Sequence, residues 1–212
     1  MPRPILWTFR RCPYAMRARL AIQSAGVAVD LREILLRDKP DEFLTASPKG
    51  TVPVIQHGET VIEESLDVMH WALNQNDPEG WRDMPENGYD LITQADGPFK
   101  QALDRTKYAV RYPEVDASEE RAKAGAFLTT LDAQLDDTPY LFGHKPCLAD
   151  MAILPFVRQF AHTDLDWFNA QPWQATARWL EAFNASDRFQ NIMTKYPPWQ
   201  PGDAPTAFPK AA

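Results

Sequence analysis

Cysteine is scarce in this chain of 212 residues, which has only Cys12 and Cys147, far apart in the sequence. Small domains that depend on disulfides are dense in paired cysteines, so the pattern excludes a disulfide scaffold and indicates reduced thiols. Histidine is also sparse. The four histidines show no spacing that would place two on one helical face, and no CxxC motif accompanies them. We therefore expect no metal site.

Long apolar runs and an excess of positive charge are missing as well. No segment approaches the roughly 20 apolar residues that cross a bilayer, and the apolar run at residues 5–9 is too short for the core of a signal peptide. We expect no membrane partner and a cytoplasmic location. The 22 Lys and Arg are outnumbered by 29 Asp and Glu, which gives a net charge of -7. Because nucleic-acid binding depends on cations that neutralise phosphates, we expect no nucleic-acid partner.

The first part of the chain alternates between strand and helix patterns. Residues 5–9 are typical of a short buried strand, and Pro13 fits the first position of a helix that should continue to Ala25. The patterns that follow are those of a half-exposed strand (27–32), a short helix (39–46), a hairpin (54–56 and 60–62) and a helix that opens at 63–65. The predicted order is strand, helix, strand, helix, strand, strand, helix.

The helix that begins at Pro13 has a narrow face of small residues. This face consists of Ala18, Ala21, Ile22 and Ala25, which recur at helical spacing and permit close packing on a sheet. Arg17 and Arg19 lie off this face.

The second part of the chain follows a change in composition. Residues 74–88 are rich in Asn, Asp, Pro, Glu and Gly and have little apolar periodicity, as an exposed connection does. We expect domains at 1–74 and 89–212, joined by a linker at 75–88. Apolar stripes at helical spacing beyond the linker predict a helical bundle, with a kink or break at Gly97-Pro98 and at Pro155. The proline-rich tail after Pro197 should wrap the surface or be mobile.

Cys12 is the residue that points most directly to chemistry. It lies between the first predicted strand and the helix that Pro13 begins, where unpaired N–H groups and the helix dipole favour a thiolate. We therefore expect its pKa to lie below the value of about 8.5 for a free cysteine. A lone cysteine can also be an inert buried residue. Arg10 and Arg11 either add to the positive field or are solvated surface cations.

Two further places of interest stand at the ends of predicted elements. Pro53 precedes the strand at 54–56, as it must because proline has no N–H for a sheet interior. A cis bond there would expose the preceding backbone, although most X-Pro bonds are trans. Glu64 and Ser65 open the next helix. They are either a capped N-terminus or a place where free N–H groups and a hydroxyl receive a ligand carboxylate.

Four motifs, taken in order, give the sequence a family resemblance. They are Arg11-Cys12-Pro13-Tyr14-Ala15, Thr51-Val52-Pro53-Val54, the acid–serine pair within Glu64-Ser65-Leu66-Asp67, and Leu148-Ala149-Asp150. Over nearly its whole length the chain resembles the glutathione transferase superfamily, most closely omega-type transferases and the two-domain bacterial glutaredoxin. The resemblance implies an α/β thioredoxin-like N-terminal domain, with a mixed four-stranded sheet and a cis Pro53, followed by an all-α C-terminal helical bundle.

The resemblance also implies roles in binding glutathione as a cosubstrate. Cys12 would face the glutathione sulfur. Val52, beside Pro53, would pair its backbone with the cysteinyl part of glutathione. Glu64 and Ser65 would hold the γ-glutamyl end.

Three other positions bear on the family pattern. Lys39 lies where omega-type proteins place a cation near the glycyl carboxylate, and is otherwise a solvated helix lysine. Dithiol glutaredoxins have a second cysteine where this chain has Ala15, so a monothiol cycle is implied. Cys147 stands where the family has the Ser or Thr of a capping box, and we read its partner Asp150 as structural. An alternative role for Cys147 is that of a resolving thiol for Cys12.

Together with the reactive position of Cys12, the resemblance implies a glutathione-dependent transferase that reduces mixed disulfides, dehydroascorbate-like acceptors or glutathionyl adducts through a Cys12–glutathione disulfide. One alternative is conjugation of glutathione to an electrophile, and another is a non-catalytic binding or regulatory protein with the same fold. The acceptor pocket is expected from the helix around 99–112 and from Trp167 and Phe168, which could equally be core. The resemblance also implies a homodimer.

Overall fold

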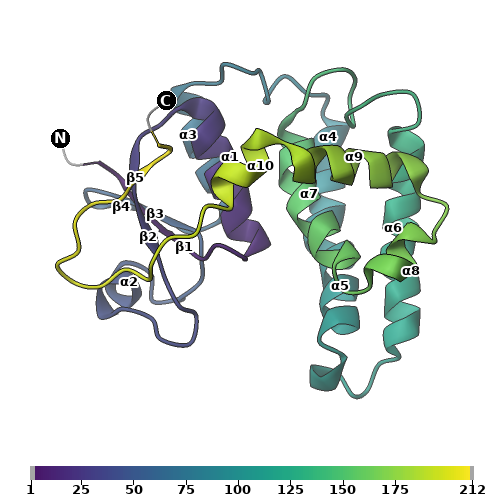
Figure 1. Ribbon diagram of the computed structural model, residues 1–212, viewed down its shortest axis with the longest axis horizontal. Coiled ribbons are helices and arrows are strands. Elements are labelled where there is room, and N and C mark those ends of the chain that lie inside the picture. The colour runs from purple at the N-terminus through teal and green to yellow at the C-terminus, as the bar shows by residue number, and fades with distance from the viewer. Residues whose placement is uncertain (1–2, 211–212) are drawn as a thin grey trace. The chain divides into compact units, whose positions relative to one another are not determined.

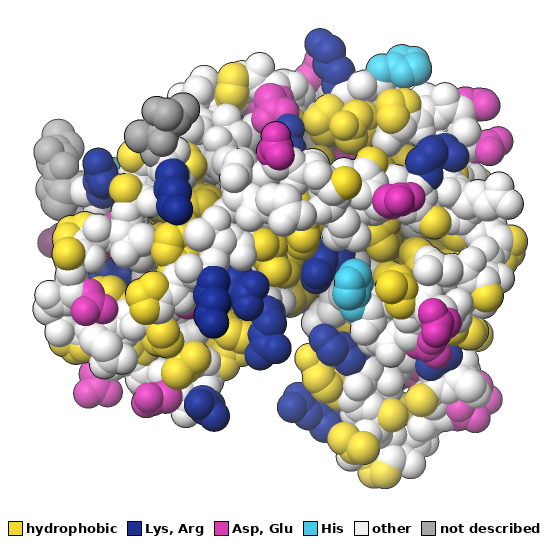
Figure 2. All heavy atoms as spheres, viewed as in Figure 1, with side chains coloured by type: hydrophobic (Ala, Val, Ile, Leu, Met, Phe, Trp, Pro, Cys, Tyr) yellow, Lys and Arg dark blue, Asp and Glu magenta, His cyan; other side chains and the backbone are white. Residues whose placement is uncertain are grey.

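The computed structural model describes residues 3–210 (Figure 1). The chain forms two compact units. Of the described residues, the first unit contains those up to Glu79 and those from Ser186 to Lys210, and the second is Gly80–Ala185. On the face shown in Figure 2, side chains of both charge signs are interspersed, and one small group of Lys and Arg side chains stands together on the first unit.

A mixed sheet forms the centre of the first unit. Its strands are β1 (Ile5–Thr8), β2 (Val29–Glu33), β3 (Val54–His57), β4 (Thr60–Ile62) and β5 (Ala207–Phe208). The order across the sheet is β4-β3-β1-β2-β5, with β1 parallel to β2 and the other pairs antiparallel. The prediction of four strands was wrong by one, because the tail returns to pair Phe208 with Val29 and Ala207 with Asp30.

Four helices complete the first unit: α1 (Pro13–Ala25), α2 (Asp41–Ala46), α3 (Ser65–Gln75) and α10 (Asp187–Ile192). Helix α1 ends where expected, since Gly26 adopts the left-handed conformation with φ of 65°. It packs against both α3 and α10 (Figure 1). Helix α2 begins two residues later than predicted because Pro40 is its N-cap, so Lys39 precedes the helix. The arrangement of β1 to β4 with α1 to α3 is thioredoxin-like, as expected.

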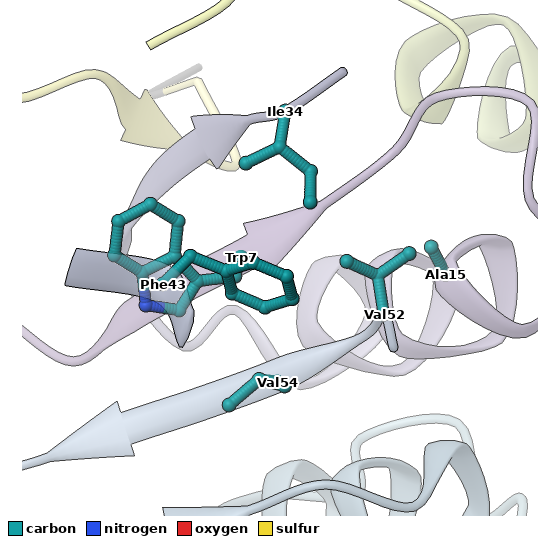
Figure 3. Close-up of a cluster of buried hydrophobic side chains, with 6 residues drawn as sticks. All are labelled: Trp7, Ala15, Ile34, Phe43, Val52 and Val54. Carbon is teal, nitrogen blue, oxygen red and sulfur yellow. The ribbon is translucent and has the colours of Figure 1, made fainter. Parts of the chain in front are cut away.

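A buried apolar cluster holds the sheet to its flanking elements. Its members, drawn in Figure 3, are Trp7, Ala15, Ile34, Phe43, Val52 and Val54. The partly buried Ile5, Phe9, Cys12 and Trp199 pack against them. The Trp7 ring lies 5.5 Å from that of Phe43 and 5.2 Å from that of Trp199, centroid to centroid. The cluster therefore ties β1, the start of α1 and the loop before β3 to one another, and Cys12 lies at its border.

The tail is part of the first unit rather than of the helical domain to which the sequence assigned it. Arg188 of α10 forms two hydrogen bonds to the Glu79 carboxylate, at 2.6 and 2.9 Å, and Ser24 of α1 donates to the same carboxylate at 2.6 Å. Further on, the Trp199 N–H donates to the Glu33 carbonyl at 2.8 Å. These contacts join segments far apart in the sequence, which residue patterns alone could not place together.

The second unit is helical. It consists of α4 (Asn87–Gln94), η1 (Ala95–Phe99), α5 (Lys100–Lys107), η2 (Ala109–Arg111), α6 (Ala117–Gln134), α7 (Leu148–Ala161), α8 (Leu165–Asn169) and α9 (Gln174–Ala185). The break expected at Gly97-Pro98 is the π-helical turn η1, whereas α7 continues through Pro155. Within residues 3–210, no helix combines the length and the apolar character needed to cross a membrane.

Candidate functional site

The Cys12 thiol is placed by a tight turn between β1 and α1. Cys12 is the N-cap of α1, with φ of -73° and ψ of 123°, and Pro13 occupies the first helical position. The Cys12 N–H donates to the Phe9 carbonyl at 3.0 Å, and its own carbonyl accepts from the Met16 N–H at 2.9 Å. The side chain is half-buried and is not in a disulfide. The thiol therefore stands at the positive end of a helix and remains accessible.

Val52 and Pro53 face Cys12 from the loop before β3. The bond between them is cis, as the resemblance implied. The Cys12 Sγ lies 3.8 Å from the Val52 carbonyl oxygen, within reach of a weak thiol donor. The Val52 N–H has no hydrogen-bond acceptor among the described residues. It is thus available to a ligand backbone.

The start of α3 carries Glu64 and Ser65. Glu64 is the N-cap and accepts through its carbonyl from the Val68 N–H at 2.9 Å. Its carboxylate is exposed and receives a hydrogen bond of 2.5 Å from Lys49 Nζ, a cation that the sequence patterns did not single out. Ser65 is the first helical residue and is 5% exposed. The helix start thus offers backbone donors, a hydroxyl and a neighbouring cation.

Arg17 lies behind this helix start. It is fully buried, and its Nη1 donates to Ser65 Oγ at 3.3 Å, while its guanidinium lies over the Tyr14 ring at 5.6 Å. Arginine can only donate, so Ser65 Oγ is the acceptor and keeps its own O–H to donate elsewhere. The sequence analysis placed Arg17 off the apolar face of α1 and did not predict its burial. The signal that it missed is the apolar residue on each side of Arg17 and of Arg19, in a helix that the structure buries almost completely.

Arg19, two residues along α1, is 1% exposed. Its Nη1 donates to Thr8 Oγ1 at 2.5 Å and its Nη2 to the Arg10 carbonyl at 2.6 Å. Glu33 of β2 accepts from the Arg10 N–H at 2.7 Å. Burial lowers the pKa of Arg19 to about 10, against the attraction of Glu33, and burial raises the pKa of Glu33 above its usual range. A buried pair of opposite charges therefore holds the segment that leads into Cys12.

Lys39 is half-buried and lies just before α2. Its Nζ is 3.1 Å from the position that a Cβ on Gly50 would occupy, and Gly50 has a positive φ of 62° that favours glycine. The structure therefore brings Lys39 to the loop that leads into Val52. Cys12, Val52, Pro53 and Lys39 gather around this loop, and Glu64 and Ser65 stand at the start of α3.

Cys147 and Asp150 form a separate, structural group in the second unit. Asp150 accepts from the N–H groups of Cys147 and Leu141, both at 2.9 Å, and from Trp179 Nε1 at 3.0 Å. Cys147 Sγ donates to the same carboxylate at 3.1 Å. Burial, with the nearby Asp150 charge as a second cause, raises the pKa of Cys147 to about 12. A buried thiol held protonated is a poor nucleophile, which disfavours the resolving role considered above.

The aromatic residues expected to line an acceptor pocket differ in how far they are buried. Phe99 and Phe168 are buried in the core of the second unit, whereas Trp167 and Tyr108 are half-exposed. A cavity of about 390 Å³ lies over Phe99 and Phe127 and is bordered by charged residues of α5 and α6.

Within the described part of the chain, no three His, Cys, Asp or Glu side chains are grouped so that they could hold a metal ion.

Comparison with protein families gives a match for each part of the chain. Residues 6–80 match the model of the glutathione S-transferase N-terminal domain, and residues 100–200 match that of the glutathione S-transferase C-terminal domain.

The similar curated proteins are matched over part of their length. A probable glutathione transferase of Aplysia californica is 47% identical over 57 residues, which are 27% of this chain and 62% of that protein. Glutathione S-transferase DHAR3, chloroplastic, of Arabidopsis thaliana is 27% identical over 145 residues, which are 68% of this chain and 53% of that protein. The chain thus spans roughly half to three fifths of the length of these relatives.

Solved structures show the same fold at low sequence identity. Glutathione transferase Omega 3C from Trametes versicolor superposes with a TM-score of 0.77 at 18% identity, over 91% of this chain and 84% of that one. A glutathione transferase family member from Pseudomonas fluorescens, solved with two glutathione bound, gives 0.75 at 17% identity, over 90% and 92%.

Proposed function

Since the chain belongs to the glutathione S-transferase family, we propose that it is a glutathione-dependent transferase that uses Cys12 for thiol transfer or deglutathionylation. The observation that carries the proposal is the position of Cys12, at the N-cap of α1 and 3.8 Å from the carbonyl of Val52, which precedes the cis Pro53. The family often uses a hydroxyl to activate the glutathione thiol. Here a thiol occupies the N-cap, and a thiolate there attacks sulfur directly.

In the proposed complex, glutathione binds to residues around Cys12. Its cysteinyl backbone pairs with Val52, next to Pro53, and its sulfur faces Cys12. The γ-glutamyl carboxylate receives the Ser65 O–H and the N–H groups at the start of α3. Glu64 holds the γ-glutamyl amino group, and Lys39 provides a cation for the glycyl carboxylate.

The proposed reaction balances with two molecules of glutathione. The Cys12 thiolate attacks the glutathione sulfur of a mixed disulfide, so that the acceptor leaves as a thiolate and Cys12 becomes bonded to glutathione. A second glutathione thiolate then attacks that disulfide, releasing oxidised glutathione and restoring the Cys12 thiolate. With Ala15 where dithiol proteins have cysteine, the second glutathione takes the place of a resolving cysteine.

The test compares the parent with Cys12→Ser, Cys12→Ala and Cys147→Ser. Turnover of a small glutathionyl mixed disulfide should be lost in both Cys12 variants and kept in Cys147→Ser. Oxidised glutathione should add one tripeptide to the parent at Cys12, detected by mass spectrometry and removed by reduced glutathione. If Cys12→Ser turned over the disulfide as fast as the parent, or if Cys147 took up the tripeptide, the thiol-transfer proposal would fail.

The same variants examine two other functions. Conjugation of glutathione to an electrophile would persist or rise in Cys12→Ser, because a serine hydroxyl leaves the glutathione sulfur free to attack. A non-catalytic protein would bind immobilised glutathione without turnover of either substrate.

We also propose a cytoplasmic homodimer, on family resemblance and on the reduced state that Cys12 requires. Light scattering that shows a stable monomer at micromolar concentration would overturn the dimer.

A further inference from the structure

The peptide of Arg10 is held from both sides by buried charged side chains. Its N–H donates to the Glu33 carboxylate at 2.7 Å, and its carbonyl accepts from Arg19 at 2.6 Å. Arg10 lies two residues before Cys12, within the turn that the Cys12 N–H closes on the Phe9 carbonyl. Arg19 is also fixed to the end of β1 through Thr8 Oγ1. The strand, the helix and the turn between them thus meet at one guanidinium.

A buried arrangement of opposite charges is expected to contribute little to stability. Removing two charges from water carries a desolvation penalty that their attraction only partly offsets, and apolar side chains of similar size often serve as well. Arg19 Nε has no hydrogen-bond partner among the described residues, which adds the cost of an unsatisfied buried donor. A buried charged side chain whose N–H donors are not all hydrogen-bonded is expected mainly near a functional site, where its role in function outweighs its cost in stability.

We propose that Arg19 and Glu33 are positioning residues for Cys12: together they fix the turn that sets the thiol at the N-cap of α1, and their opposite charges tune how readily that thiol ionises. The proposal rests on Cys12 being the reactive group of the proposed function. Arg19 and Cys12 attract each other, so the guanidinium favours the thiolate. The negative charge of Glu33, which lies on the other side of the Arg10 backbone, should oppose it.

The charged and titratable groups around Arg19 come from several elements. They are Glu33 of β2, Cys12 and Arg10 of the turn, and Tyr196 of the tail, whose own pKa is raised by burial. Cys12 and Glu33 both attract the guanidinium, and Arg10 repels it. The guanidinium that interacts with the thiol is therefore itself subject to opposed charges from fixed positions, and a single substitution among them is expected to change the balance in either direction.

The experiment measures the rate of Cys12 alkylation by iodoacetamide as a function of pH, in a Cys147→Ser background. Arg19→Gln should raise the midpoint of the profile by about 0.5–1 pH unit and slow alkylation at pH 6 about threefold to tenfold, since each unit is a tenfold change in thiolate. Glu33→Gln keeps an oxygen to accept the Arg10 N–H but removes the negative charge. It should lower the midpoint and speed alkylation at pH 6 by a similar factor.

Two controls separate charge from packing. Arg19→Lys retains the charge and should keep its midpoint near that of the parent. Arg32→Gln removes a neighbouring arginine that stacks on Trp7 and Trp199, at 4.9 and 4.3 Å from the ring centroids, and should leave the profile unchanged. All variants are compared by melting and by near-ultraviolet circular dichroism. If Arg19→Gln does not fold, the Glu33→Gln and Arg19→Lys profiles still decide.

Opposite shifts for the two glutamine variants support the proposal. Shifts in the same direction would show only a loosened turn, and unchanged midpoints would show no tuning, so either result overturns it. Alkylation requires no glutathione. A protein with shifted profiles but no mixed-disulfide turnover would therefore refute the proposed function and leave this inference standing.

Discussion

The Ser65 hydroxyl is oriented by a neighbour that can only donate. Because Arg17 supplies the hydrogen bond, the hydroxyl proton of Ser65 is directed to another acceptor, and a ligand carboxylate is the acceptor that suits it. The buried cation behind the hydroxyl adds a favourable charge for an anion. Two arginines of α1 therefore support opposite ends of the proposed glutathione site, Arg17 behind Ser65 and Arg19 behind the Cys12 turn.

At this residue scale we predict that Ser65→Ala and Glu64→Ala each weaken glutathione binding by about 1.5–3 kcal/mol, the range for a hydrogen bond to a charged group. Arg17→Met should weaken binding with Ser65 still present, because the hydroxyl loses the donor that orients it. Titration calorimetry gives the affinities, with Glu59→Ala on the β3–β4 hairpin as a control that should not alter binding. Unchanged affinity in the Glu64 and Ser65 variants, with normal melting, would mean that this helix start is only a cap.

Some residues of the site were predictable and others were not. Cys12 and the Val52-Pro53 pair were found from short motifs whose chemistry depends on local backbone, namely a helix start and a proline before a strand. The burial of Arg17 and Arg19 was not predicted, because helical periodicity assigns charged side chains to the exposed face of a helix. A buried charge is made possible by distant partners such as Ser65 and Glu33, and their proximity is a property of the folded chain.

At the scale of elements, α7 begins with a buried carboxylate that serves four donors, of which the Cys147 thiol is one. We predict that Asp150→Ala lowers the free energy of unfolding by about 3 kcal/mol or more, since two backbone N–H groups and the Trp179 indole would be buried unsatisfied at 1–3 kcal/mol each. Cys147→Ser should change it by less than about 1 kcal/mol, because the hydroxyl can donate to Asp150 in place of the thiol. Denaturation in urea measures both. An equal loss in the two variants would show that the thiol, and not the carboxylate, organises this helix start.

The boundaries of an element could be predicted where the residues that set them are close together in the sequence. Helix α1 and strand β4 matched because proline, glycine and a tight hairpin fix their ends within a few residues. The interruption at Gly97-Pro98 was expected, although its π-helical form was not. Strand β5 could not be foreseen, since two residues carry no periodicity and become a strand only through pairing with β2.

At the scale of the whole chain, Glu79 and Arg188 tie the two sequence-distant parts of the first unit together. We predict that Arg188→Ala lowers the free energy of unfolding by about 1 kcal/mol, near the upper end for a partly exposed pair because the contact is bidentate. Arg188→Lys should recover only part of this, as a point charge cannot make the paired contact. Lys123→Ala, which removes an exposed lysine from Glu120, is the control and should have a smaller effect.

The returning tail also shields a sheet edge. The Leu31 N–H donates to the Thr206 carbonyl at 2.8 Å, and the Thr206 N–H donates to the Asp30 carboxylate at 2.7 Å, so β2 is occupied along its outer side. Without the tail, β2 would present unpaired backbone groups beside exposed apolar surface, the arrangement through which sheets of separate molecules join and aggregate. Shortened versions of this chain that end after α10 should therefore be prone to form insoluble material even where the remaining domain core is intact.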